Sequence, residues 1–183
     1  ETAIMATYTY QGTLNEDDLG ELIPQEPSVI NPYAAFGTSV SIYHLLGSDS
    51  YLSIAVKDGE SIALYELDMA TAMELLRDRG FADLEFIAGV NDPTKAYFSN
   101  GNQVYDLTES EIQAVRSALK SMTSSYSVRL GSLNGGEWTL AFEEDVDRLE
   151  CQYYPAKDLI KVGQSIFFDE LGTIKALLAS KAA

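Results

Sequence analysis

The chain has one cysteine, Cys151, and one histidine, His44, among its 183 residues. A single cysteine cannot form an internal disulfide, and a cysteine-based zinc site needs several thiolates, so both are excluded. No stretch approaches the roughly 18 apolar residues of a membrane-spanning helix, and no basic-then-apolar leader opens the chain. The sequence therefore predicts that this segment does not insert into a membrane.

Cations are also scarce. The chain has 12 lysines and arginines against 28 aspartates and glutamates, which gives a formal charge of −16. Such a potential repels phosphate backbones, so a nucleic acid is not expected as a partner. The hydrophobic fraction of 46% is that of a folded chain, because disordered segments lack the apolar residues that offset chain entropy.

The first residue is Glu1 and not methionine, and the composition is acidic, poor in lysine and rich in tyrosine. We interpret the start as the trace of a removed leader or anchor. The expected location is therefore extracytoplasmic, in a secreted or membrane-anchored bacterial protein.

The most informative stretch surrounds Thr108. Threonine is a preferred N-cap, and Glu111 follows it by three residues, as a capping box requires. Leu107 and Ile112 are placed to form a hydrophobic staple over the first turn. The dipeptide Asn100-Gly101 just before is a strong signal for a two-residue hairpin turn. A strand leading directly into a helix is predicted.

Similar caps at Asn15, Asp68 and Asp169 each follow a segment with strand character. We predict an α+β fold made of degenerate repeats, in which an antiparallel β-meander precedes an α-helix and the helices pack on antiparallel sheet. The spacing of the caps is too uneven for a solenoid. One domain over residues 1–183 is expected, with a strand, a short helix and a proline-punctuated connector in 1–36, and meander-helix units in 37–80, 81–125 and 126–183.

The predicted elements follow from turn residues and hydrophobic periodicity. Helices are expected after Asn15 as far as Pro24, after Asp68 as far as a left-handed stop at Gly80, over 109–123, and after Asp169. Strands are expected within 1–14 and at 38–46, 51–57, 61–67, 83–89, 95–99, 103–107, 126–133, 137–144, 147–153 and 159–168.

No arrangement of residues indicates catalysis. His44 shares a strand face with apolar neighbours, which predicts a core or edge histidine whose ring is hydrogen-bonded. Cys151 alternates with Leu149 and Tyr153 on a face that reads as buried, where a thiol is inert, so a Cys–His dyad is disfavoured. The sequence has no nucleophile elbow and no phosphate-binding loop. A non-catalytic protein is the leading hypothesis. The alternative is a carboxylate-dependent hydrolase acting on glycans.

Two acidic turns offer hard oxygen ligands within a few residues of one another. Calcium is the only cofactor for which the sequence has a candidate site, although neither turn has EF-hand spacing. The candidate ligands are Glu143, Glu144, Asp145 and Asp147 in one turn, and Asn15, Glu16, Asp17 and Asp18 in the other.

Aromatic residues suggest a binding surface. Tyr153 and Tyr154 are adjacent on one predicted strand, so their rings point to opposite faces and one of them is expected to be exposed. With Trp138 they form the candidate binding set. Exposed tyrosine on an acidic sheet is suited to protein recognition. We therefore predict a binding module for a protein or peptide, which engages a sheet face or an edge strand. An inhibitor of a secreted enzyme is a further alternative.

Overall fold

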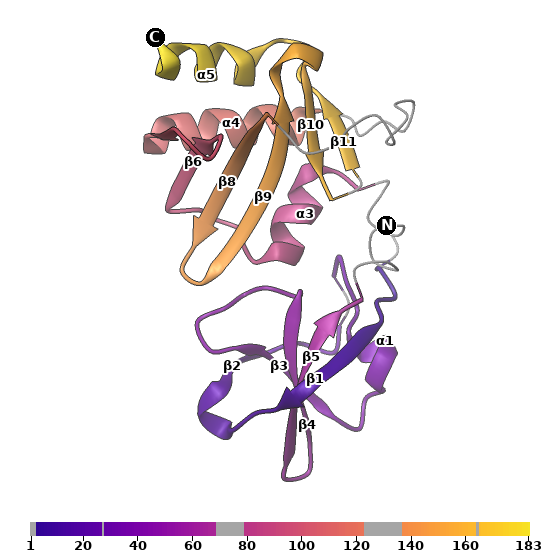
Figure 1. Cartoon of the computed structure of the whole chain (residues 1–183). Coiled ribbons are helices and arrows are strands. Elements are labelled where there is room, and N and C mark those ends of the chain that lie inside the picture. Colours follow the sequence, from indigo (N-terminus) through magenta and orange to yellow (C-terminus); the bar gives the residue numbers. More distant parts are fainter. Residues whose placement is uncertain (1–2, 27, 69–78, 123–136, 164) are drawn as a thin grey trace.

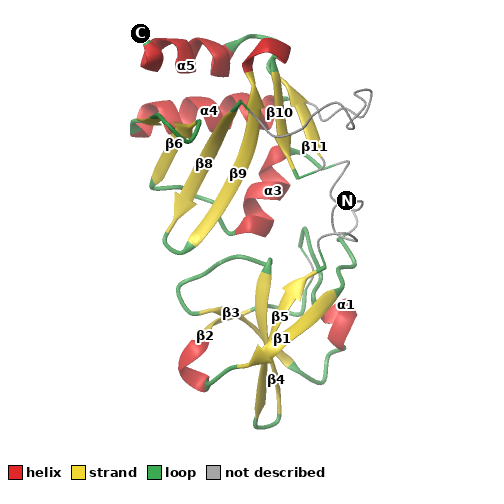
Figure 2. Ribbon diagram, in the orientation of Figure 1, coloured by secondary structure: helices red, strands yellow, loops and turns green. Residues whose placement is uncertain are grey.

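The computed structural model describes residues 3–26, 28–68, 79–122, 137–163 and 165–183. The fold is α+β, with two antiparallel sheets that follow one another in the chain (Figures 1 and 2). The predicted helix after Asp68 and the predicted strand 126–133 lie largely or wholly outside the described residues.

The first sheet has the strand order β1-β5-β4-β3-β2, with neighbours antiparallel throughout. A short helix, α1 (Tyr33–Phe36), lies beside it (Figure 1). The strands are β1 (Tyr8–Thr13), β2 (Leu19–Leu22), β3 (Ser41–Leu45), β4 (Ser53–Asp58) and β5 (Ser61–Leu67).

The second sheet has the order β11-β10-β9-β8-β6-β7. Helices α3 (Phe81–Ala88) and α4 (Glu109–Ser121) lie behind it in Figure 1, and α5 (Thr173–Ala182) packs beside α4. The opposite face, toward the viewer, is covered by none of these three helices. The strands are β6 (Lys95–Ser99), β7 (Val104–Asp106), β8 (Trp138–Glu144), β9 (Asp147–Tyr154), β10 (Leu159–Val162) and β11 (Ser165–Phe168), with a single turn of 3-10 helix, η3 (Pro155–Lys157), after β9.

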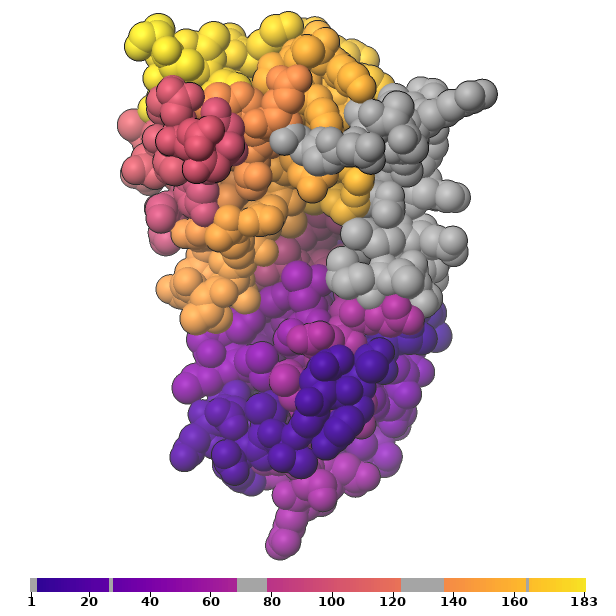
Figure 3. Space-filling view, in the orientation of Figure 1, coloured from indigo at the N-terminus to yellow at the C-terminus, as the bar shows by residue number. Residues whose placement is uncertain are grey.

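The main hydrophobic core draws on both sheets. Ile42 and Ile54 of the first sheet belong to the same buried cluster as Phe98 and Leu140 of the second. Burying these side chains removes apolar surface from water, which is the main favourable term in folding. The atoms of the two sheets accordingly meet along a broad boundary (Figure 3).

The capping box at the start of α4 is confirmed. The Thr108 hydroxyl accepts from the Glu111 N–H at 3.4 Å, and the Glu111 carboxylate accepts from the Thr108 N–H at 2.7 Å. Leu107 and Ile112 are both buried, as expected of a staple over the first turn. The helix start is thus fixed by residues close in sequence.

Replacing Thr108 with alanine is expected to lower the free energy of unfolding by about 1 kcal/mol, since the Glu111 N–H loses its acceptor. Urea unfolding followed by circular dichroism measures the loss. Thr108→Ser is the control, because serine retains the hydroxyl. A Thr108→Ala protein as stable as the wild type would show that water replaces the cap at no cost.

The predicted strand 83–89 is wrong, because this segment forms helix α3. Its buried residues Phe81, Leu84, Glu85 and Ala88 have helical spacing. Gly80 was predicted to end a helix in a left-handed conformation, but it has φ −74° and is the N-cap of α3. A segment this short cannot distinguish the helical period of hydrophobic residues from the alternating period of a strand. The tertiary contacts of this face therefore decide that the segment is a helix.

The predicted short helix after Asn15 is also wrong. One turn of 3-10 helix, η1 (Glu16–Asp18), is followed at once by strand β2. A Cβ atom on Gly20 would lie 2.5 Å from the carbonyl oxygen of Leu45, so glycine allows β2 to approach β3 this closely. Pairing with β3 therefore outweighs the local helix signal.

The single strand predicted at 159–168 is a hairpin of two strands, β10 and β11, which pair antiparallel. Asp169 does act as a helix cap, but from a distance. Its carboxylate accepts from the N–H groups of Ile174 and Lys175 at 3.0 and 3.1 Å, while Gly172 is the N-cap residue of α5. The helix therefore begins later than the sequence suggested.

Candidate functional site

The two predicted binding tyrosines are buried. Tyr153 is 0% exposed and packs near Phe98 in the main core, and Tyr154 is 6% exposed. The expectation that one ring is exposed is wrong, because β9 is an interior strand that pairs with both β8 and β10, and at this end both of its faces are covered. Trp138 is partly exposed, and its ring stacks on Tyr105 at 5.6 Å between centroids.

The acidic turn between β8 and β9 does not gather its carboxylates. Glu143 Oε1 accepts from the Tyr97 hydroxyl at 3.1 Å and lies 3.6 Å from Arg148 Nη1. Glu143 Oε2 lies 3.6 Å from Lys95 Nζ. Glu144 accepts from the N–H of Asp92 at 2.6 Å. Among the described residues no group of three or more histidine, cysteine, aspartate or glutamate side chains is placed to hold a metal ion. The calcium site stays a prediction.

His44 and Cys151 lie in different sheets. His44 Nδ1 lies 3.0 Å from the carbonyl oxygen of Ser50, and its ring contacts the Tyr51 ring edge-on, which confirms the predicted hydrogen-bonded core histidine. Cys151 is fully buried. Burial, reinforced by the nearby charges of Glu85 and Glu150, raises the pKa of its thiol far above the ordinary value. A thiol in this state is a poor nucleophile.

We expect the Cys151 thiol to react with a disulfide reagent such as 5,5′-dithiobis(2-nitrobenzoic acid) only when the protein opens. The native protein at neutral pH should give no fast release of the coloured product, and the protein in denaturant should release one equivalent. Rapid reaction of the native protein would contradict the buried, protonated thiol.

The main feature that sequence reasoning missed is a junction between the two sheets. Asp147, at the start of β9, accepts from the Ser48 hydroxyl at 2.6 Å and from the Asp49 N–H at 2.7 Å, both on the loop between β3 and β4. On the same loop, the N–H of Tyr51 donates to the carbonyl oxygen of Ile87 at 2.8 Å. A buried carboxylate thus ties the tip of one sheet to a loop of the other.

Two adjoining hollows lie at this junction, and together we name them the junction cleft. The larger has a volume of about 470 Å³ and the smaller about 370 Å³. They share Leu52, Ala88 and Arg148, so they form one depression whose walls come from both sheets. The other lining residues are Leu45, Leu46, Ser48, Ser50, Ser53, Val146 and Asp147 in the larger hollow, and Leu84, Ile87, Leu149, Glu150, Val162, Gly163 and Ser165 in the smaller.

Two exposed aliphatic side chains flank the larger hollow. Leu46 is 66% exposed just after β3, and Val146 is 70% exposed in the turn between β8 and β9. In Figure 1 this turn lies directly above the loop that joins β3 to β4. Turn positions are usually polar, so two exposed aliphatic residues beside one apolar depression make this surface a candidate for interaction.

The face of the second sheet that α3, α4 and α5 do not cover is a more polar alternative. A hollow of about 330 Å³ there is lined by Tyr97, Arg148 and Glu150, among others. The Tyr97 ring is already occupied by cations of this chain, because Lys95 Nζ lies 5.1 Å and the Arg148 guanidinium carbon 5.7 Å from its centroid. Arg148 is also ion-paired with Glu150. This surface satisfies its own charges and leaves fewer groups for a partner.

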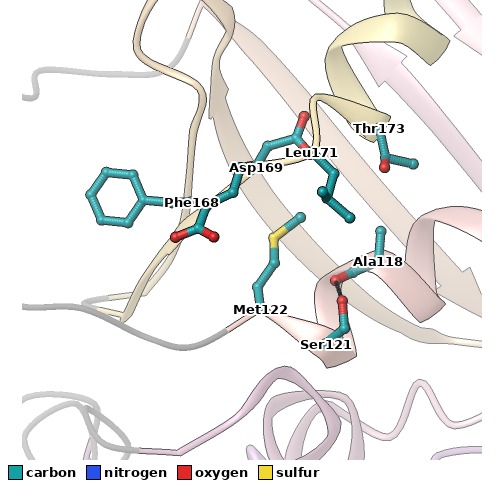
Figure 4. Close-up of a pocket in the computed structure, with 8 residues that line it drawn as sticks. Ala118, Ser121, Met122, Phe168, Asp169, Leu171 and Thr173 are labelled. Carbon is teal, nitrogen blue, oxygen red and sulfur yellow. Dashed lines mark hydrogen bonds between the residues drawn. The ribbon is translucent and has the colours of Figure 1, made fainter.

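A third hollow, of about 220 Å³, lies between the end of α4 and the start of α5 (Figure 4). Met122, Phe168 and Leu171 give it apolar walls, and the Ser121 hydroxyl donates to the carbonyl oxygen of Ala118 at 2.7 Å. Asp169 also lines it, but one oxygen of its carboxylate is committed to capping α5. This hollow is smaller than the junction cleft and is formed within one sheet and its helices.

Comparison of the chain with protein-family models, with curated proteins and with solved structures finds no match in any of the three. None of the helices in the described part of the chain is long and apolar enough to cross a membrane.

Proposed function

We propose that the protein is a non-catalytic binding module that holds a segment of a protein or peptide in the junction cleft. The observation that carries this proposal is the position of Leu46 and Val146, which project from two different sheets beside a largely apolar depression. Hollows of this size fall in the range typical of ligand sites. A bound segment that covers these two side chains would remove apolar surface from water, which favours binding by about 25 cal/mol per Å² buried.

The extracytoplasmic location belongs to the same proposal and is supported by composition, because the chain is acidic and poor in lysine. We likewise propose that the chain consists of degenerate meander-helix repeats. This proposal is supported best around β6, β7 and α4, where the predicted order of hairpin and helix holds.

The test is to select short extended peptides from a random library against the whole chain and to measure the affinity of the selected peptides by calorimetry. Leu46→Ser and Val146→Ser are each expected to weaken binding about tenfold or more, as loss of a buried aliphatic contact implies. Val104→Ser is the matched control, since Val104 is 61% exposed on β7, at the far edge of the second sheet.

Selected peptides that lose affinity for the two cleft variants and keep it for Val104→Ser would support the proposal. Failure to select any peptide, or equal binding to all three variants, would overturn it.

A further inference from the structure

We infer that the segment bound in the junction cleft carries lysine or arginine beside its apolar side chains. This inference rests on the proposed function and names the chemistry of the partner. It follows from the charges that the fold places on the two sides of the cleft, where Leu46 and Val146 each lie next to an acidic turn.

The first acidic turn is η1 (Glu16–Asp18). The N–H of Leu46 donates to the carbonyl oxygen of Asp18 at 2.9 Å, so this turn lies against the residue that flanks the cleft. Glu16 is paired with Lys57. Asp17 is exposed, and among the described residues no lysine or arginine is paired with it.

The second acidic turn contains Val146 itself. Asp145 precedes it and Asp147 follows it, and the two have different roles. Asp147 is buried and bonded to Ser48 and Asp49, whereas Asp145 is exposed in a left-handed conformation at φ 50°. Within the described chain, Asp145 too has no lysine or arginine paired with it.

Positive charge at the cleft is already neutralised. Arg148 is the only lysine or arginine among the described residues that line the cleft, and it is ion-paired with Glu150 and lies 3.6 Å from Glu143. The two flanks therefore offer two carboxylates, at Asp17 and Asp145, with which no lysine or arginine of the described residues is paired.

Charge complementarity decides between occupants. An anionic segment would meet repulsion from both flanks and from a chain of charge −16. A neutral apolar segment would cover Leu46 and Val146 but leave the carboxylates unused. Lysine and arginine side chains lay their methylene stems along apolar surface and keep the charged head at its edge. An apolar residue flanked by basic residues thus matches both the cleft and its flanks.

The test uses three synthetic peptides of equal length, with alternating lysine and leucine, alternating glutamate and leucine, or alternating lysine and serine. Titration into ¹⁵N-labelled protein gives both the affinity and the site. The lysine-leucine peptide is expected to bind most tightly and to shift the amide signals of Leu46 and Val146. Raising the salt concentration from about 0.05 M to about 0.5 M is expected to weaken binding of the lysine-leucine peptide severalfold, since the Debye length shortens from roughly 14 to roughly 4 Å.

Variants separate the local charges from the charge of the whole chain. Asp17→Asn with Asp145→Asn removes two flank charges, and asparagine tolerates the left-handed backbone of residue 145. This pair is expected to weaken lysine-leucine binding about three- to tenfold, as two exposed charge contacts imply. Asp106→Asn with Glu109→Gln removes the same charge at exposed positions near β7, at the far edge of the second sheet, and should have little effect.

The outcomes distinguish this inference from the proposed function. If the glutamate-leucine peptide binds as well as the lysine-leucine peptide, or if the two double variants behave alike, the cationic partner is wrong and the apolar cleft stands. If the lysine-serine peptide binds as well as the lysine-leucine peptide, attraction to the acidic chain explains the binding, and both the cationic-apolar partner and the cleft are overturned.

Discussion

Replacing Glu85 with leucine is expected to lower the free energy of unfolding by about 3–5 kcal/mol, because the change leaves the buried guanidinium of Arg116 without its counter-charge. The two side chains are 3% and 7% exposed. Arg116 Nε donates to Glu85 Oε1 at 2.7 Å, and Nη2 reaches Glu85 Oε2 at 3.4 Å and also donates to the carbonyl oxygen of Asn91. The pair joins α3 to α4.

The size of this loss comes from the unpaired charge and not from the strength of the pair. The double variant Glu85→Leu with Arg116→Leu is therefore expected to recover much of the stability, since an apolar pair of similar volume avoids the desolvation of both charges. Guanidinium unfolding of the single and double variants measures the difference.

Asp92→Asn is the control for this prediction. Asp92 lies 3.9 Å from the same guanidinium, but its side chain is 86% exposed, so its loss should change stability by less than about 0.5 kcal/mol. A double variant that is less stable than both single variants would show that the pair stabilises the fold by more than it costs to bury.

The parts of the fold that were predicted correctly are those set by residues close in sequence. The Thr108–Glu111 capping box lies within four residues of chain, and the turn signal at Asn100-Gly101 does join two neighbouring antiparallel strands. Local geometry determines such features. The strand 95–99 agrees with the structure at both ends for the same reason.

The features that could not be predicted depend on residues far apart in the chain. Asp147 is bonded to a loop 98 and 99 residues earlier, and no local pattern marks that pairing. The Glu85–Arg116 pair was missed because 83–89 was expected to be a strand. One signal was available, since Arg116 follows Val115 and lies between Ile112 and Leu119 on a helix with an apolar face. A charge in that position implies a buried partner.

The junction cleft illustrates the same limit. Both acidic turns were noted from the sequence as candidate calcium ligands, and the structure places them on the two sides of one apolar depression. Their separation in the chain exceeds 120 residues, from Asp18 to Glu143. The sequence identifies each acidic turn, but whether the two turns share a surface depends on how one sheet docks on the other.

Gly89 lies where the two sheets meet, and Gly89→Ala is expected to lower the free energy of unfolding by at least about 2 kcal/mol. Gly89 has φ 74°, a left-handed conformation that costs an alanine about 1–2 kcal/mol. A Cβ atom there would lie 2.5 Å from Asp147 Oδ2, 2.7 Å from the carbonyl carbon of Asp49 and closer still to the backbone nitrogen of Ser50. Backbone atoms cannot yield as a flexible side chain does, so the loop must move away from Asp147.

Gly101→Ala separates the two causes of this loss, because Gly101 has φ 88° and a Cβ atom there would meet nothing within 4 Å. It should cost only the backbone strain, and urea unfolding of both variants gives the difference. Equal losses would show that the loop does not press on Gly89. A larger loss for Gly89→Ala, together with shifted amide signals for Ser48 and Asp49, would show that the walls of the junction cleft are held in place by the close approach of Gly89, Asp147 and this loop.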